Sequence, residues 1–259
     1  MLHDGLTDGM YGIHMGVTAD NIAKKYSISR EDQDAFAYAS QQKAIAAIDS
    51  GRFQDEIVPV EVPGRKGSVT VFDTDEHPNR ASTPEKLAKL RPAFTKDGTV
   101  TAGNASGIND GASFTIIASE DAVKKHNLTP LAEVIGIGQG GVDPRVMGLG
   151  PTPAILHALK YADLCIEDME LVELNEAFAA QSLGVIHELE EATGMDRNAF
   201  MEKTNVNGGA IALGHPVGAS GNRILVSLLH EMQKRDLKIG LASLCIGGGQ
   251  GAAVIIKRV

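Results

Sequence analysis

The second half of the chain alternates short apolar runs with longer stretches of helical spacing, and this alternation restricts the fold more than any other feature. Helices are predicted at Ala154–Tyr161, at Asn175–Leu189 and along the apolar stripe from Ile224 to Met232. Strands that alternate with helices pack as layers, so the predicted fold class is α/β. Four runs have the length and composition of strands: Leu131–Ile137, Leu171–Leu174, Ile239–Cys245 and Ala252–Ile256.

The first half is predicted to consist of helices joined by loops. Ser29 and the acidic residues that follow it resemble a capping box, which predicts a helix over about Arg30–Ser50. Ile57–Val62 alternates as a short edge strand, and the polar stretch Pro63–Gly98 is expected to be a long loop. Phe114–Ala118 has the composition of a buried strand.

Composition argues against several classes of protein. The 259 residues carry a net charge of -9, which disfavours general binding to nucleic acids or anionic membranes, because such binding is electrostatic. No apolar run is long enough to cross a bilayer, and the N-terminal MLHDGLTDGM lacks the core of a signal peptide. The two cysteines form no zinc-ligand cluster, so no metal site is expected. So few thiols fit a reducing compartment, and the predicted location is the cytoplasm.

Polar residues lie among glycines at predicted element ends, which is where open α/β folds place their ligands. An asparagine at the start of a helix, such as Asn175, is more often a cap than a catalytic group. A lone histidine such as His215 is more often structural, although Gly214 and Pro216 on either side favour a functional role. The stretches concerned are His14–Gly16, Thr101–Gly107, Asn175–Phe178 and Gly208–Gly221.

Cys245 comes directly before Ile246 and three glycines, in the sequence SLCIGGGQG. A structural thiol and a reactive thiol are about equally consistent with this position. Glycine leaves room around a reactive thiol, and its backbone N–H groups can stabilise a thiolate or a substrate oxyanion.

A match to the dinucleotide-binding pattern GxGxxG lies at Gly136–Gly141. That motif requires a helix to begin directly after the glycines, and Val142-Asp143-Pro144 predicts none. We therefore expect no dinucleotide site at these glycines.

Three motifs in this order, NEAF at Asn175–Phe178, GHP at Gly214–Pro216 and CIGGG at Cys245–Gly249, resemble those of the thiolases, the acetyl-CoA acetyltransferase family. HMG at His14, TAGNASG at Thr101, LRPAF at Leu90 and VMG at Val146 extend the resemblance over essentially the whole chain. It implies a mostly helical loop domain that binds CoA over residues 1–109. It also implies a layered α/β half-domain over residues 129–259, with 110–128 as the returning strand and helix of an N-terminal half-domain.

The resemblance also implies roles for individual residues. His215 activates the nucleophilic cysteine and helps to bind the thioester oxygen, while Cys245 is the acid/base that takes a proton from the α-carbon of acetyl-CoA. Asn175 holds a water of the same oxyanion site, and the Gly247 N–H serves a second one. Arg80 is a candidate for a CoA phosphate. The other CoA contacts that carry over are Leu6, His14, Met15, Phe94, Ala102, Ala105, Ser106, Gly107, Met147, Ala177 and Phe178.

The chain departs from the family in one respect. A full thiolase begins with a half-domain that carries the nucleophilic cysteine, and this chain starts after it. Cys165 has no glycines around it and is expected to be structural. Phe114–Ala118 would then lack its sheet neighbours and leave an apolar strand exposed. A partner is therefore expected: a second copy of the chain, or a complementary N-terminal thiolase polypeptide.

Three functions follow from these observations. The first is the C-terminal portion of an acetyl-CoA C-acetyltransferase, with CoA thioesters as substrates, no permanently bound cofactor, and no activity on its own. HMG at His14 favours the short-chain type. The second is a non-catalytic protein that binds CoA or acyl-CoA and is similar to the thiolase-like lipid-transfer proteins. The third is a nucleotide-binding oxidoreductase, which is supported only by the GxGxxG match at Gly136–Gly141.

Overall fold

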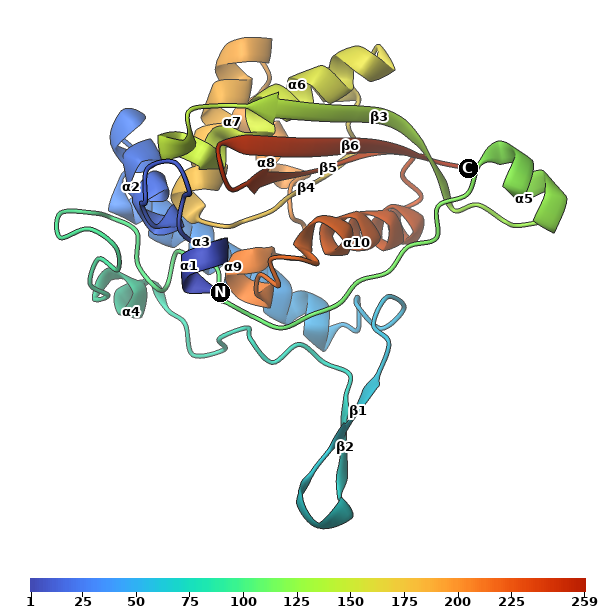
Figure 1. Cartoon of the computed structure of the whole chain (residues 1–259), viewed down its shortest axis with the longest axis horizontal. Coiled ribbons are helices and arrows are strands. Elements are labelled where there is room, and N and C mark those ends of the chain that lie inside the picture. The colour runs from blue at the N-terminus through green and yellow to red at the C-terminus, as the bar shows by residue number, and fades with distance from the viewer.

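A four-stranded mixed sheet lies at the centre of the fold in a computed structural model that describes residues 1–259 (Figure 1). The strand order is β3-β6-β5-β4; β4 runs parallel to β5, and β6 is antiparallel to both of its neighbours. The sheet confirms the α/β prediction, and LVEL forms β4 as expected. The strand bounds are β3 Ala132–Gly141, β4 Leu171–Leu174, β5 Ile239–Ile246 and β6 Gln250–Arg258.

Helices cover both faces of this sheet, so the half-domain has three layers. On one face, α6 (Pro151–Ala162) and α7 (Ala179–Thr193) pack against apolar side chains of β4, β5 and β6. On the other face, α10 (Ser220–Arg235) packs its apolar stripe against β4, β5 and β6. The alternation along β4 explains the division, because Val172 and Leu174 belong to the first core and Leu171 to the second.

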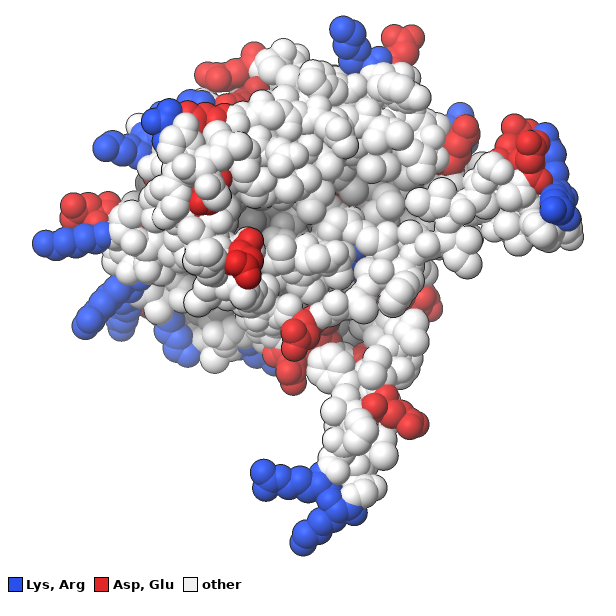
Figure 2. All heavy atoms as spheres, viewed as in Figure 1, with Lys and Arg blue, Asp and Glu red and all other residues white.

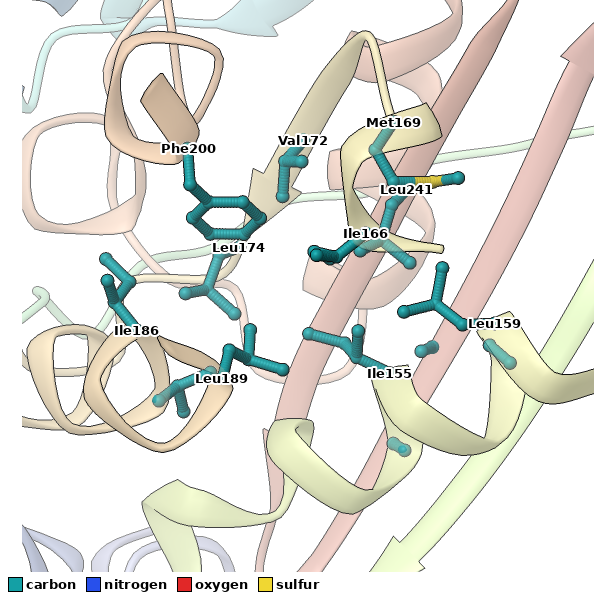
Figure 3. Packing of buried hydrophobic residues seen from close by; sticks show 14 of the residues in the cluster. Ile155, Leu159, Ile166, Met169, Val172, Leu174, Ile186, Leu189, Phe200 and Leu241 are labelled. Atoms are coloured by element: carbon teal, nitrogen blue, oxygen red, sulfur yellow. The ribbon is translucent and has the colours of Figure 1, made fainter. Parts of the chain in front are cut away.

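The larger core lies between α6, α7 and the sheet (Figure 3). Ile155 and Leu159 project from α6 toward Leu241 of β5, and Phe200 of α8 (Arg197–Glu202) closes the far side. These side chains are almost completely buried. Burial of each stabilises the fold by about 1.5–3 kcal/mol relative to exposure.

The N-terminal helices pack against α7 and, more extensively, against η2 (Pro144–Leu149) and α9 (Ala210–Leu213). They are α2 (Met15–Lys25) and α3 (Arg30–Asp49), and Ile22 of α2 reaches the larger core. The Ser29 hydroxyl accepts a hydrogen bond from Asp32 N, so the predicted cap and helix are confirmed. The division of the chain at residues 109 and 128 stays a prediction.

A two-stranded hairpin projects from the body of the molecule (Figure 1). The predicted strand Ile57–Val62 is wrong in its bounds, because β1 comprises Val60–Pro63. It pairs with β2 (Val69–Phe72) across the turn η1 (Arg65–Gly67), inside the stretch predicted to be a loop. A four-residue strand with no buried residue has little apolar periodicity, which is why the sequence did not reveal β2.

Phe114–Ala118 is not the buried strand that its composition predicts. The structure agrees with the other expectation, that this apolar segment lacks sheet neighbours and is exposed. Phe114, Ile116 and Ile117 are 89%, 95% and 86% exposed and form no sheet pairing. They belong to an extended segment that runs from the site region to α5 (Glu120–His126), a helix with no buried residue. The face on which this segment lies carries few charged side chains at its middle (Figure 2).

The helix predicted over Asn175–Leu189 begins later, at Ala179, so Asn175–Phe178 is a loop and Asn175 is not the cap of α7. None of the helices combines the length and apolar composition needed to span a membrane. The remaining short elements are α1 Leu2–Gly5, α4 Pro84–Ala88, η2 Pro144–Leu149, η3 Ile166–Asp168 and α9 Ala210–Leu213.

The glycines of the GxGxxG match lie in β3, where they allow α6 to approach the sheet. A Cβ on Gly138 would overlap the backbone carbonyl of Ala154 in α6. The segment is a strand followed by the 3₁₀ helix η2, and this is not the strand–turn–helix unit that binds a dinucleotide.

We predict that Gly138→Ala destabilises the fold, whereas Gly141→Ala does not. The first Cβ meets helix backbone, which cannot rotate away; the second meets nothing within 4 Å. Overpacking of this kind costs about 1–3 kcal/mol, and a surface change about 0.5 kcal/mol or less. Urea unfolding followed by circular dichroism measures both. Equal free energies of unfolding for the two variants would contradict the packing described for β3 and α6.

Candidate functional site

The polar site lies at the carboxyl ends of β4 and β5. Asn175 directly follows β4, and its backbone N–H donates to the Ser243 carbonyl at 2.9 Å. Cys245 lies near the end of β5. Because the two strands are parallel, their carboxyl ends meet at one edge of the sheet and bring these residues to the same place.

His215 reaches this edge from the loop after α9. Its ring Nε2 lies 3.3 Å from Asn175 Nδ2, and its backbone N–H donates to Asn109 Oδ1 at 3.3 Å. Gly214 before it has φ of +98° and packs directly against the Asn109 side chain, so only glycine fits there. The structure therefore brings together Asn175 and His215, which lie 40 residues apart.

The hydrogen bonds of Ser220 determine which nitrogen of His215 carries the proton. The Ser220 hydroxyl donates to the Pro216 carbonyl at 3.0 Å, and its oxygen lies 2.6 Å from His215 Nδ1. Since its single proton is already donated, the oxygen accepts from Nδ1–H. The lone pair on Nε2 then faces Asn175, and Nε2 is the basic nitrogen.

Burial and the nearby charge of Arg223 lower the pKa of His215 to about 4. The ring is therefore neutral at physiological pH, and Nε2 can accept a proton. Asn175 Oδ1 is buried and has no hydrogen-bond partner within the chain. An orphaned acceptor beside a histidine is a suitable place for an ordered water or a ligand.

Cys245 differs from the reactive thiolate that its glycines suggest. It is only 9% exposed and lies in an apolar cluster, and burial raises the pKa of its thiol to about 12. The thiol is therefore protonated at neutral pH. The glycines lie just beyond it, in the turn between β5 and β6, where Gly247 is exposed and its N–H donates to no group of the chain.

Most of the predicted CoA contacts line the same apolar cluster around Cys245. His14 stacks on Phe94 with ring centroids 4.8 Å apart, and Phe94 meets Phe178 edge to face at 6.0 Å. Ser106 follows Ala105, and its N–H donates to the Ala177 carbonyl at 3.0 Å. The cluster contains Leu6, Met15, Phe94, Ala105, Met147, Ala177 and Phe178.

Three predicted residues lie at or near a separate cavity of about 1020 Å³. Arg80 and Ala102 line it, and Gly107 packs against its lining residue His77. Arg80 is paired with Asp49, with the closest nitrogen and oxygen 2.5 Å apart. The cavity borders the site, because His77 Nδ1 lies 3.4 Å from Asn109 Nδ2, and Asn109 in turn accepts from His215.

Sequence reasoning missed two residues that hold His215. Ser220 lies five positions after it, within the motif GHPVGASG, so the motif itself contained the signal. Asn109 lies 106 positions before His215, and its local sequence carries no such signal. The structure has no group of three or more His, Cys, Asp or Glu side chains suited to hold a metal ion.

Cys165 lies at the opposite end of the sheet from the site. It precedes β4, whereas Cys245 and Asn175 lie at the other ends of β5 and β4. Its side chain is exposed, and the thiol donates to Asp168 Oδ2 at 3.0 Å. That hydrogen bond raises its pKa, so Cys165 has neither the position nor the ionisation of a nucleophile for this site.

Comparison with known proteins extends these observations over the whole chain. Residues 1–121 match the model of the thiolase N-terminal domain, and residues 128–258 match that of the thiolase C-terminal domain. The acetyl-CoA acetyltransferase of Thiocystis violacea is 59% identical over all 259 residues. The chain spans 64% of the length of that relative.

Solved structures show the same similarity. The acetyl-CoA acetyltransferase from Syntrophomonas wolfei superposes with a TM-score of 0.92 at 47% identity. The match covers 100% of this chain and 64% of the Syntrophomonas chain. Human mitochondrial 3-ketoacyl-CoA thiolase in complex with CoA superposes with a TM-score of 0.86 at 50% identity. That match covers 98% of this chain and 61% of the human chain.

We predict that His215 makes the fold less stable at acidic pH. Its pKa is about 4 in the folded chain and about 6.5 when unfolded. Between these values the unfolded chain binds more protons, so the free energy of unfolding falls as pH falls. From pH 7 to pH 4, the wild type should lose about 3 kcal/mol more than His215→Gln. The exposed His126→Gln is the control, and a wild-type loss no larger than that of His215→Gln in urea titrations would contradict the burial of the ring.

We predict that a thiol reagent distinguishes the two cysteines. At pH 8 iodoacetamide should label the exposed Cys165 in the folded chain, although its raised pKa slows the reaction, and Cys245 only after denaturation, because labelling requires an accessible thiolate. Mass spectrometry of Cys165→Ser and Cys245→Ser identifies each thiol. Rapid labelling of native Cys165→Ser would show that Cys245 is open to solvent and ionised.

Proposed function

Because this chain belongs to the thiolase family, we propose that it is the C-terminal portion of an acetyl-CoA C-acetyltransferase and carries the acid/base half of the active site. Such an enzyme joins two acetyl-CoA molecules to acetoacetyl-CoA, or cleaves a 3-ketoacyl-CoA with CoA. The observation that supports it most is the contact between Asn175 and His215 beside the buried thiol of Cys245.

The protonation states of the site suggest an order of proton transfers. Neutral His215 takes the proton of a nucleophilic thiol at Nε2, and the resulting thiolate attacks acetyl-CoA and expels CoA thiolate. Cys245 is held as a thiol, so it gives its proton to the leaving CoA and becomes a thiolate. With its high pKa, that thiolate is a strong base for the α-proton of a second acetyl-CoA.

The carbanion then attacks the acetylated thiol and expels it, and the proton on His215 Nε2 returns to the leaving sulfur. The oxyanions formed on the way need hydrogen-bond donors that are already in position. For one of them we propose His215 Nε2–H together with a water held by Asn175, and for the other the free N–H of Gly247.

We propose that the nucleophilic thiol comes from outside these 259 residues, because Cys165 is at the far end of the sheet. About a third of each relative lies outside the alignment. We propose that this part, as an N-terminal thiolase segment, covers the extended stretch Asn109–Ala118 and the face beside it, which carries few charged side chains at its middle (Figure 2). The stretch Asn109–Phe114 and the loop Pro216–Ala219 line a groove of about 360 Å³ there, next to His215.

The proposed CoA site is the apolar cluster around Phe94 together with the neighbouring cavity. The apolar side chains suit the pantetheine arm, and Arg80 and Lys86 line the cavity as cations for phosphate groups. CoA is a substrate in this proposal, and the location proposed is the cytoplasm, which suits two unpaired cysteines. Assembly with further copies is also proposed.

The alternative is a non-catalytic protein that binds CoA or acyl-CoA. Both ring nitrogens of His215 have hydrogen-bond partners, which fixes its tautomer. A site that only binds CoA does not need a fixed tautomer, so this arrangement argues against the alternative. The third function, a nucleotide-dependent oxidoreductase, loses its only support, because Gly136–Gly141 packs as a strand against α6.

We predict that the chain alone does not cleave acetoacetyl-CoA with CoA, and that a chimera does. The chimera carries the uncovered N-terminal part of the Thiocystis violacea relative ahead of Met1. In it, His215→Ala should lower kcat by about 10²–10⁴-fold, because a general base is lost. Cys165→Ser is the matched control and should keep full activity.

Each other result has a distinct meaning. Activity of the 259-residue chain alone, lost in His215→Ala, would place the nucleophile within it and overturn the proposal. A folded chimera that binds CoA in calorimetry without turnover would support the non-catalytic alternative.

A further inference from the structure

Glu176, the residue after Asn175, has a buried carboxyl group that none of the proposed proton transfers uses. It is 1% exposed, and burial raises its pKa despite the donors around it. A buried carboxyl group is costly unless it is fully hydrogen-bonded. Its partners therefore indicate what it holds in place.

The carboxyl group accepts hydrogen bonds from three separate segments. Ser40 Oγ of α3 donates to Oε2 at 2.6 Å, Asn205 Nδ2 donates to Oε1 at 2.8 Å, and Ile211 N of α9 donates to Oε2 at 3.3 Å. Lys43 of α3 is the nearest cation and contributes only through its charge. One side chain thus connects α3, the loop before α9, and α9 itself.

These contacts act on both members of the Asn175–His215 pair. On the Asn175 side, Asn205 also donates to the Leu174 carbonyl at 2.7 Å and accepts from Leu174 N at 2.8 Å. The end of β4 is therefore held just before Asn175 by Asn205 and just after it by Glu176.

On the His215 side, Glu176 supports the start of α9, the helix that leads directly into Gly214 and His215. Gly209 before α9 has no side chain to cap it, and its backbone lies against the carboxyl group so closely that a Cβ would overlap it. Gly209 N instead donates to Ser40 Oγ at 3.0 Å, and Glu176 accepts from Ile211 N. The capping groups of α9 thus come from other segments.

We infer that Glu176 is a positioning residue that sets the separation between Asn175 and His215 by tying the end of β4 to the start of α9. The relevance of Glu176 to catalysis rests on the proposed function. Its effect on the separation between Asn175 and His215 does not depend on that function. The chemistry requires a group with two acceptor oxygens, since three donors converge on it. Glutamine has the same shape and loses one acceptor, so it leaves one donor unpaired.

The test compares Glu176→Gln with Glu173→Gln in the 259-residue chain. Glu173 is a buried carboxyl group of β4 that accepts no hydrogen bond from α3 or α9, so it is a matched control. Nitrogen-15 NMR of the His215 ring, assigned with His215→Gln, reports its tautomer and its pKa. We expect Glu176→Gln to raise that pKa by one unit or more, a tenfold change in proton affinity, and to mix the tautomers. Glu173→Gln should leave the tautomer unchanged; because Glu173 and His215 both lie near the charge of Arg223, the tautomer is the signal on which the two variants are compared.

The chimera gives a second measurement. Glu176→Gln should lower kcat by about 10²-fold, the effect of a small misplacement of catalytic groups, with KM unchanged because no CoA contact is altered. If Glu176→Gln fails to fold, Ser40→Ala removes one of the three donors and should shift the ring signals in the same direction.

An unchanged His215 ring spectrum in a folded Glu176→Gln chain would overturn the inference, as would an equal mixing of tautomers in Glu173→Gln. The NMR result does not depend on turnover. An inactive chimera with the expected ring shifts would therefore count against the proposed function alone.

Discussion

The parallel pairing of β4 with β5 is the constraint on which the site depends. It brings the residue after β4, Asn175, level with the end of β5, where Cys245 lies. It also divides the apolar residues of β4 between the two faces of the sheet, so that α7 packs on one side and α10 on the other. Since α10 begins five residues after His215, the helix that completes the second core also delivers the histidine and its partner Ser220 to the same edge.

Burial then determines the chemistry that these groups can perform. Removal from water disfavours a charge on either residue, so His215 stays a neutral base and Cys245 stays a thiol. The two groups are thus in opposite protonation states at neutral pH, because His215 Nε2 carries no proton and the Cys245 sulfur keeps one. The hydrogen bond from His215 Nδ1 to Ser220 and the contact with Asn175 fix the orientation of the ring, because together they direct the Nε2 lone pair toward the Asn175 amide.

The same fold leaves a run of large apolar side chains exposed. Phe114, Ile116 and Ile117 of the extended segment are almost fully exposed, and α5 beyond has no buried residue. Exposed apolar patches of this kind mark an interface. The segment also leads away from Asn109, which holds His215, so whatever covers these side chains is connected to the site through a continuous stretch of backbone.

Local sequence determined the α/β class, β4, the helix after Ser29 and the motifs of the site, because each depends on periodicity, capping or a short pattern of residues. It misplaced elements whose conformation is decided by distant contacts. The sequence Asn175–Phe178 predicts the start of a helix, yet β5, Glu176 and its partners hold it as a loop. Phe114–Ala118 has the composition of a strand but no neighbour to pair with. The low pKa of His215 and the high pKa of Cys245 also came only from the tertiary structure, because the desolvation that causes them comes from residues far away in the chain.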